Sequence, residues 1–440
     1  MKRFLHGLFF LMLTAESPGA YGAYWHLPFS LSYSLIFDWK PLAAPNIDIF
    51  TLIIVFGSAP FAIRPDPIGR SLLLSTGTLA AWSAYGILTG GSAYQVQFQI
   101  HTLLASFLFA VACRRTLQTP QDYFAFGKTL IYAALYRALM CVLFYAFVVA
   151  PGVLDPPPPF CTSHDDTVLF VTALMTLCIH LGFFPSPLQR RRVLYASGLI
   201  LTGIVLNNRR LAWVSLISAI VLVLAVLPSS SRQLIRRYTI RVLPLLALYA
   251  LIGWGRPEAV FAPLRSLSSV APGQEDASTR SRDAENAGLI FTLRQNPAFG
   301  SGWGHQYIET DDSLSAREFT QYRYVPHNSL LGLLAFSGFL GFYGVWLIWP
   351  VCGYLAARAV RHARDPASRC FGMVILVTQI VVMNQVWGDM GLFSYTTTFI
   401  MAAACSCASR LHAFETSMLA SRTPQPVSFD PPAARHAAFG

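Results

Sequence analysis

Runs of apolar residues recur along the whole chain, and short polar or charged stretches separate them. After an apolar region within residues 4–37, each run is long enough to cross a hydrocarbon core of about 30 Å as a helix. The repetition predicts an all-α polytopic membrane protein. We expect the further helices near 47–63, 70–90, 96–113, 127–151, 166–184, 192–206, 210–227, 239–254, 329–353, 370–388 and 391–409.

With one crossing in residues 4–37, the pattern predicts about twelve transmembrane helices and one large loop between the ninth and the tenth. The four expected parts are helices one to nine over 1–254, the loop over 255–327, helices ten to twelve over 328–410 and a tail over 411–440. The apolar run Leu289–Leu293 and the glycine-rich run Phe299–Gly304 indicate that the loop folds into a small cap. The tail is rich in Ala, Pro, Ser and Arg without a hydrophobic period, which predicts disorder.

The composition and the charge distribution also indicate a membrane protein. The chain is 54% hydrophobic and 12% charged, and soluble domains are about 25% charged. The net charge of +11 could indicate nucleic-acid binding, but most basic residues lie in short clusters between apolar runs. Such clusters mark connections on the cytoplasmic side, so we expect no nucleic-acid partner and place both termini in the cytoplasm. The basic connections contain Arg64 and Arg70, Arg114 to Lys128, Arg190 to Arg192, Arg232 to Arg241, and Arg358 to Arg369.

Some arginines lie against this bias, on the outer side of the predicted topology. Arg209 and Arg210 stand at the outer ends of the seventh and eighth helices. Arg280 and Arg282 lie in the large outer loop. An anionic ligand is one explanation, because a guanidinium stays charged and binds diphosphate with two hydrogen bonds at once. The other is that long loops cross regardless of charge, so that loop arginines simply pair with loop acids such as Glu285.

A histidine completes a candidate site on the outer side. His327 stands between Pro326 and Asn328 at the start of the tenth predicted helix, where free backbone N–H groups face a ligand. Histidine is the side chain best able to take a proton from a hydroxyl near neutral pH. With the outer arginines, it predicts a site that holds a lipid diphosphate and activates an alcohol, with Asn328 in its lining.

Four more residues are candidates for this lining, each with a structural alternative. Arg137 lies inside the fifth helix, where a charge is costly and often functional, but it could also form an ion pair. Asp389, between the last two helices, could orient an arginine or a histidine, or be a solvated turn residue. His305 follows the glycine-rich run and could line the site. Trp303 could stack on a sugar, although aromatic residues are common at membrane interfaces.

Several of these runs resemble the signature of the O-antigen ligase and polymerase superfamily. The resemblance is carried by Asn296–His305 with its proline and glycines, and then by His327–Gly341, which opens with His-Asn and ends in glycines. Arg282–Asn286 is similar to an R-D-x-E-N variant of some members, and Asn208–Trp213 to the family's arginine turn. The resemblance covers about residues 195–345 and the twelve-helix plan.

The resemblance implies a glycosyltransferase of the bacterial inner membrane that works on the periplasmic face, with an undecaprenyl-diphosphate-linked glycan as donor. By motif, His327 would be catalytic, Arg282 and Arg210 would bind the diphosphate, and Arg280 is a further candidate. Arg209 is the rival of Arg210, because this chain has Asn-Arg-Arg where many members have Ser-Arg-Gly. The expected reaction inverts the anomeric carbon, and it needs no metal or cofactor because arginines can neutralise the diphosphate.

The same motifs serve several acceptors. Transfer to lipid A–core, as in an O-antigen ligase, is the favoured reaction. The alternatives are a polymerase of lipid-linked repeat units for O-antigen or exopolysaccharide, and transfer to protein. A glycan-lipid transporter is the non-enzyme alternative, and it is disfavoured because the ionisable residues concentrate in an outer loop rather than on midplane helices. Besides the donor and the acceptor, membrane lipids are the expected partners.

Overall fold

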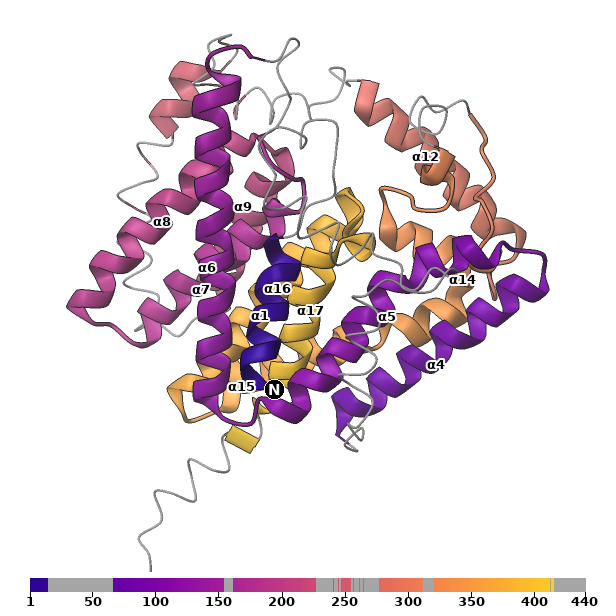
Figure 1. Ribbon diagram of the computed structural model, residues 1–440, viewed down its shortest axis with the longest axis horizontal. Coiled ribbons are helices and arrows are strands. Elements are labelled where there is room, and N and C mark those ends of the chain that lie inside the picture. Colours follow the sequence, from indigo (N-terminus) through magenta and orange to yellow (C-terminus); the bar gives the residue numbers. More distant parts are fainter. Residues whose placement is uncertain are drawn as a thin grey trace, which may run out of the picture.

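The computed structural model describes residues 1–14, 66–153, 161–226, 277–311 and 320–411, with short pieces between 240 and 264 and at 413–414. Every regular element in these residues is helical (Figure 1). The predicted helix at 47–63 lies outside the described residues, as do residues 239, 241–243, 245 and 246 of the predicted helix at 239–254 and the tail after residue 414.

Twelve α-helices make up the described part. They are α1 (Lys2–Thr14), α4 (Pro67–Leu88), α5 (Ala93–Thr116), α6 (Pro120–Phe144), α7 (Asp166–Phe183), α8 (Pro187–Asn207), α9 (Arg210–Val226), α12 (Ala277–Gln295), α14 (Ser329–Trp346), α15 (Ile348–His362), α16 (Pro366–Gly388) and α17 (Tyr395–Ala408). A π-helical turn, Tyr145–Val149, extends α6, and 3-10 turns occupy Thr320–Arg323 and Gly391–Phe393. Six described segments are long and apolar enough to cross a membrane, and α9 and α17 are shorter apolar helices. The protein is therefore an all-α, multi-pass membrane protein, while twelve crossings stay a prediction.

Side-chain caps mark where several helices begin. Thr119 and Asp122 form a capping box at the start of α6, and Asp66 and Asp365 cap α4 and α16 just before a proline. Each cap accepts a hydrogen bond from a backbone N–H that has no partner within the helix. These helices therefore begin a few residues before the apolar run from which they were predicted. The last helix instead begins later than its predicted residue 391, because a 3-10 turn precedes it.

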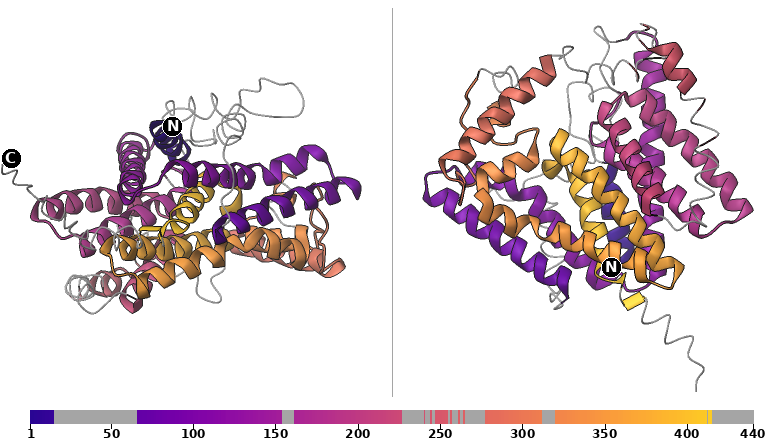
Figure 2. Two further views of the ribbon diagram at one scale, coloured as in Figure 1. Left: turned by 90° about the horizontal axis from the view of Figure 1, so that it is seen from below. Right: turned by 180° about the vertical axis from the view of Figure 1, so that it is seen from behind.

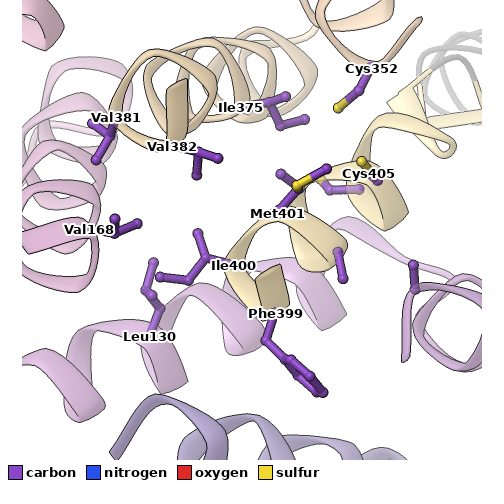
Figure 3. Packing of buried hydrophobic residues seen from close by; sticks show 14 of the residues in the cluster. Leu130, Val168, Cys352, Ile375, Val381, Val382, Phe399, Ile400, Met401 and Cys405 are labelled. Atoms are coloured by element: carbon purple, nitrogen blue, oxygen red, sulfur yellow. The ribbon is translucent and has the colours of Figure 1, made fainter. Parts of the chain in front are cut away.

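α16 lies at the centre of the bundle and packs against α7, α9, α15 and α17. Figures 1 and 2 show α6 to α9 on one side of it, and α4, α5, α12 and α14 on the other. Figure 3 shows side chains of the shared core, among them Val168 of α7, Val382 of α16 and Ile400 of α17. The turn from α16 to α17 is therefore central to one end of the bundle.

The connections gather at two opposite ends. At one end, Arg114 pairs with Asp66, and the Arg410 guanidinium donates a hydrogen bond to the Gln118 side chain (2.6 Å). This contact network joins the start of α4, the connection from α5 to α6 and the end of α17, all in or beside predicted basic connections. We call it the basic end. The opposite end, where α14 begins and α16 finishes, is called the His327 end.

A glycine breaks the predicted helix over 329–353. Gly338 has φ 59° and ψ −174° inside α14, and α15 follows α14 after one residue. The predicted crossing over 329–353 therefore lies within one candidate span, Ser329–His362, but a regular helix through Gly338 was the wrong expectation. A Cβ on Gly338 would collide with the carbonyl of Ala298, so both the backbone angle and the close approach require glycine.

This break is where the glycine-rich run attaches. The freed carbonyls of Ala335 and Phe336 accept hydrogen bonds from the N–H groups of Ser301 (3.0 Å) and Gly302 (2.9 Å). On its other side, a Cβ on Gly302 would lie 2.6 Å from the Cα of Gly86 in α4. The run is therefore wedged between α14 and α4, and it satisfies backbone groups that a helix break would otherwise leave unpaired.

Candidate active site

One buried carboxylate holds His327. Glu285 of α12 is 1% exposed. Its Oε1 accepts hydrogen bonds from the backbone N–H groups of His327 (2.7 Å) and Asn328 (3.3 Å). Its Oε2 lies 2.9 Å from Nδ1 of His327. Because a carboxylate only accepts hydrogen bonds, Nδ1 carries a proton, and in the neutral form of the ring the lone pair is therefore on Nε2.

The imidazole of His327 is also held from a second side. The Tyr322 ring packs against it, with the ring centroids 4.7 Å apart. The His327 side chain nevertheless remains 18% exposed. Within the described residues, no hydrogen bond occupies Nε2, so this nitrogen is fixed in place and open to a substrate.

Arg282 shares the face of α12 that carries Glu285, since the two are three residues apart on the helix. Its guanidinium donates a hydrogen bond to the carbonyl of Gly388 (2.6 Å), the last residue of α16. A cation suits the partial negative charge at a helix C-terminus. Among the described residues no carboxylate forms an ion pair with Arg282, so its charge remains available to an anion.

Ser329 and Asn328 fix the start of α14. The Ser329 hydroxyl donates to the carbonyl of Asp389 (3.2 Å) and accepts from the N–H of Leu392 (3.3 Å). The Asn328 side chain caps α14 by accepting from the N–H of Leu331 (3.1 Å). Asn328 was predicted to line the site, and its side-chain oxygen serves as this cap. The serine brings the turn after α16 next to His327.

Asp389 in that turn lies among cations. Burial raises the pKa of its carboxyl, but the positive charges of His164, Arg282 and Arg209 outweigh burial, so the pKa lies below its ordinary value. His327 adds to this effect. The predicted role of orienting an arginine or a histidine stays a prediction, and the structure brings Asp389 within electrostatic reach of both kinds of residue.

The turn between α8 and α9 presents the arginine pair. Asn207 is 2% exposed, and its side-chain oxygen accepts from the backbone N–H of Thr162 (3.0 Å). Asn208 then adopts the left-handed conformation, with φ 49° and ψ 40°, which asparagine tolerates better than most residues. This reversal ends α8, places Arg209 on the turn and starts α9 at Arg210.

Arg209 joins the charged group around Asp389. Burial lowers the pKa of its guanidinium, the negative charge of Asp389 opposes this, and the positive charge of Arg282 lowers it further. Arg209 and Arg282 thus lie close enough to repel each other, and an anion between them would relieve the repulsion. The sequence favoured Arg210 over Arg209, whereas in the structure Arg209 lies within electrostatic reach of Arg282 and Asp389.

Two residues of this group were missed by sequence reasoning. His164 and Asp165 precede α7, with Nε2 of the histidine 3.5 Å from Oδ1 of the aspartate. Burial lowers the pKa of His164, but the negative charges of Asp165 and Asp389 outweigh it, so the pKa is raised. Burial raises the pKa of Asp165. No motif marks these residues, and the only sequence signal is their place in a short loop on the predicted outer side.

Arg137 forms the ion pair that was one of its two predicted roles. Its Nε lies 2.8 Å from Oδ1 of Asp166, and a second guanidinium nitrogen lies 2.8 Å from Oδ2. Both side chains are at most 3% exposed. Asp166 also accepts a hydrogen bond from the N–H of Ser163 (3.3 Å). The pair therefore fixes the start of α7 and the loop that carries His164.

Other candidates lie apart from this group. Trp303 is 1% exposed and packs against Phe336, with centroids 5.7 Å apart, so no face of the indole is open to a sugar. The Nε2 atom of His305 lies 3.1 Å from the Thr89 hydroxyl oxygen, at the end of α4. Arg280 is exposed near the start of α12. The structure does not show a contact between these three and His327.

The acidic residues of the loop differ in their partners, and this bears on whether the loop arginines bind an anionic ligand or pair with loop acids. Arg323 pairs with Glu309 through two hydrogen bonds of 2.9 Å, as the structural explanation requires. Glu285 instead binds His327. Within the described ranges, no three His, Cys, Asp or Glu side chains gather in a way that could hold a metal ion.

Comparison with protein families matches residues 195–345 to the family described as O-antigen ligase. This range runs from α8 to α14 and contains Arg209, Arg282, Glu285 and His327. The comparison with curated proteins finds no match. The predicted family is confirmed over this range. Over residues 195–345 the chain therefore carries an enzyme domain of the O-antigen ligase and polymerase type, a family that transfers lipid-linked glycans.

Proposed function

We propose that this enzyme transfers a glycan from undecaprenyl diphosphate to a sugar hydroxyl, with Nε2 of His327 as the general base. The contact between Glu285 and His327 carries the proposal, because it fixes the ring through Nδ1 and leaves Nε2 open, while Arg282 lies on the same face of α12 as Glu285. The proposed location is the periplasmic face of the bacterial inner membrane, since the His327 end lies opposite the basic end.

In the proposed reaction, the acceptor hydroxyl gives its proton to Nε2 while its oxygen attacks the anomeric carbon of the donor. The bond from that carbon to the diphosphate oxygen breaks, and its electron pair leaves with the diphosphate. Glu285 stabilises the imidazolium that forms, as a buried carboxylate does for other catalytic histidines. Attack from the side opposite the leaving group inverts the anomeric carbon.

Arg209 and Arg282 are the proposed diphosphate ligands. Negative charge grows on the diphosphate as the bond breaks, and fixed cations that face it lower the barrier. Asp389 holds the two guanidinium groups in place by its own negative charge. The raised pKa of His164 favours its protonated form, which adds a third cation to this subsite.

We propose lipid A–core as the acceptor, in line with the family's description as O-antigen ligase. Deletion of the gene, followed by analysis of surface glycans, tests this choice. A ligase predicts intact core without attached chain, together with accumulated lipid-linked polymer. Core with a single repeat, or loss of exopolysaccharide, would indicate a polymerase, and loss of glycan from protein would indicate a protein glycosyltransferase. Donor trapped on the cytoplasmic leaflet would indicate a transporter, and unchanged glycans in every fraction would contradict the proposal.

A further inference from the structure

A cavity of about 490 Å³ lies in the half of the bundle nearer the basic end. Its walls come from the first halves of α6 and α16, the second halves of α7 and α17 and the start of α8. All of these lie away from the His327 end, so the cavity is separate from the candidate active site. Its volume is within the range of about 300–1,000 Å³ that small-ligand pockets occupy.

The cavity is reached from the side of the bundle, between α6 and α8. Toward the His327 end these helices touch closely, since a Cβ on Gly203 would lie 3.0 Å from that of Ala138. Toward the basic end, both helices line the cavity instead, through Tyr132 and Val193. Tyr132 is 62% exposed. In a membrane, this opening faces the lipid chains.

The interior of the cavity is apolar. Leu130 of α6, Ile375 of α16 and Ile400 of α17 line it, and Figure 3 shows these three side chains in the same part of the core. Each is buried against the rest of the bundle. The hydroxyls of Thr176 and Thr378, which also line the cavity, donate to carbonyls of their own helices, so the interior favours a hydrocarbon chain as its occupant.

The rim of the cavity is cationic. Lys128 of α6 and Arg192 of α8 line it and are exposed, and His180 and Gln189 add hydrogen-bond donors. None of the described lining residues is Asp or Glu. A cationic rim above an apolar interior matches a molecule with an anionic head and a hydrocarbon chain.

We propose that this cavity binds one anionic phospholipid from the leaflet at the basic end. Its phosphate lies between Lys128 and Arg192, and one acyl chain enters the apolar interior. Basic pockets between transmembrane helices on the cytoplasmic side are suited to anionic lipid head groups. The isoprenoid chain of a donor fits this cavity less well. In the proposed function its diphosphate binds at the His327 end, so Lys128 and Arg192 at the rim would have no anionic partner.

The test uses the purified full-length chain in phosphatidylcholine nanodiscs, with phosphatidylglycerol added and bound lipids counted by native mass spectrometry. We expect one phosphatidylglycerol to be retained in preference to phosphatidylcholine. A Lys128→Gln/Arg192→Gln variant should weaken this binding by about 5-fold for each cation removed. The matched control is Arg190→Gln/Arg191→Gln, which removes two exposed cations of α8 that do not line the cavity and should change little.

A second variant tests the interior without changing charge. Ala196→Phe on the cavity wall should exclude the lipid while the thermal midpoint stays close to that of the wild type. Equal retention of both lipids, or equal weakening by the control pair, would overturn the proposal. So would displacement by undecaprenyl phosphate at equimolar amounts, which would assign the cavity to an isoprenoid chain, or by millimolar inorganic phosphate, which would assign it to free phosphate.

Discussion

Two short segments on either side of residues 306–324 look equally prominent in the sequence and do different work. We call Asn296–His305 the glycine arm and Val325–Ser329 the histidine arm. In the glycine arm, backbone groups make the contacts, such as the hydrogen bond from the Gly302 N–H to the Phe336 carbonyl (2.9 Å). In the histidine arm, the Glu285 carboxylate binds both the backbone and the ring of His327. The glycine arm therefore stabilises the packing of the helices, and the histidine arm positions the proposed catalytic residue.

The histidines of the two arms show the same difference. Nε2 of His305 lies 3.1 Å from the Thr89 hydroxyl oxygen and 3.2 Å from the Gly86 carbonyl oxygen, so it is already engaged by α4. His327 engages only Nδ1 and leaves Nε2 open among the described residues. A histidine beside a family motif is therefore informative only when it is known which of its nitrogens is engaged.

Apart from substitution of His327 itself, the largest expected effect comes from Glu285→Gln. The glutamine can still accept from the two backbone N–H groups, but its NH₂ then faces Nδ1 and favours the tautomer with the proton on Nε2. We expect transfer to fall by about 10²–10⁴-fold, measured with purified protein and lipid-linked donor. The control is Glu309→Gln, which removes an acid that pairs with Arg323. Near-normal transfer by Glu285→Gln would show that the carboxylate does not set the tautomer.

The second prediction separates the arginines of the turn before α9. We expect Arg209→Ala to reduce transfer by about 10²–10³-fold, as loss of one group that stabilises transition-state charge does elsewhere. Arg210→Ala is the matched variant, one residue along the chain, and should cost much less. The measurement is kcat and KM for each variant at saturating acceptor. The reverse order would return the role to Arg210, as the motif alone suggested.

The smallest effect is expected in the glycine arm, and on stability rather than on chemistry. A Cβ on Gly86 would collide with the Trp303 backbone, whereas a Cβ on Gly77 of the same helix meets nothing within 4 Å. Gly86→Ala should therefore lower the free energy of unfolding by about 1–3 kcal/mol. Gly77→Ala should be neutral or stabilising by about 0.5–1 kcal/mol. Thermal unfolding of the two variants in one detergent makes the comparison. Equal midpoints would show that the glycine arm does not require the close approach between Gly86 and the Trp303 backbone.

Much of the fold could be predicted because apolar runs in a membrane protein translate directly into helices. The predicted ranges 70–90, 96–113 and 370–388 each lie on one described helix, apart from a few end residues. The break at Gly338 could not be predicted, because it depends on backbone partners supplied by Ser301 and Gly302. The apolar run contains several glycines, and the sequence does not indicate at which of them the helix is interrupted.

The candidate site was predicted by residue type but not by partner. His327 and Arg282 stood out through their motifs, yet the link from Glu285 to His327 joins residues 42 positions apart. Sequence offered Glu285 as the glutamate of the R-D-x-E-N run and as a possible arginine partner, but not as the partner of His327. Sequence favoured Arg210 over Arg209, and it could not show that the charges of Asp389 and Arg282 act on Arg209. His164 and Asp165 belong to no motif, and only the packing of their loop brings them into the charged group around Asp389.

The most direct test compares the two histidines in one assay. His327→Gln and His305→Gln are purified in the same detergent, checked for normal thermal unfolding, and assayed for glycan transfer from a lipid-linked donor. We predict that His327→Gln falls to the background rate while His305→Gln stays within about tenfold of the wild type, because only the first loses a general base. Retained transfer by folded His327→Gln would contradict the account.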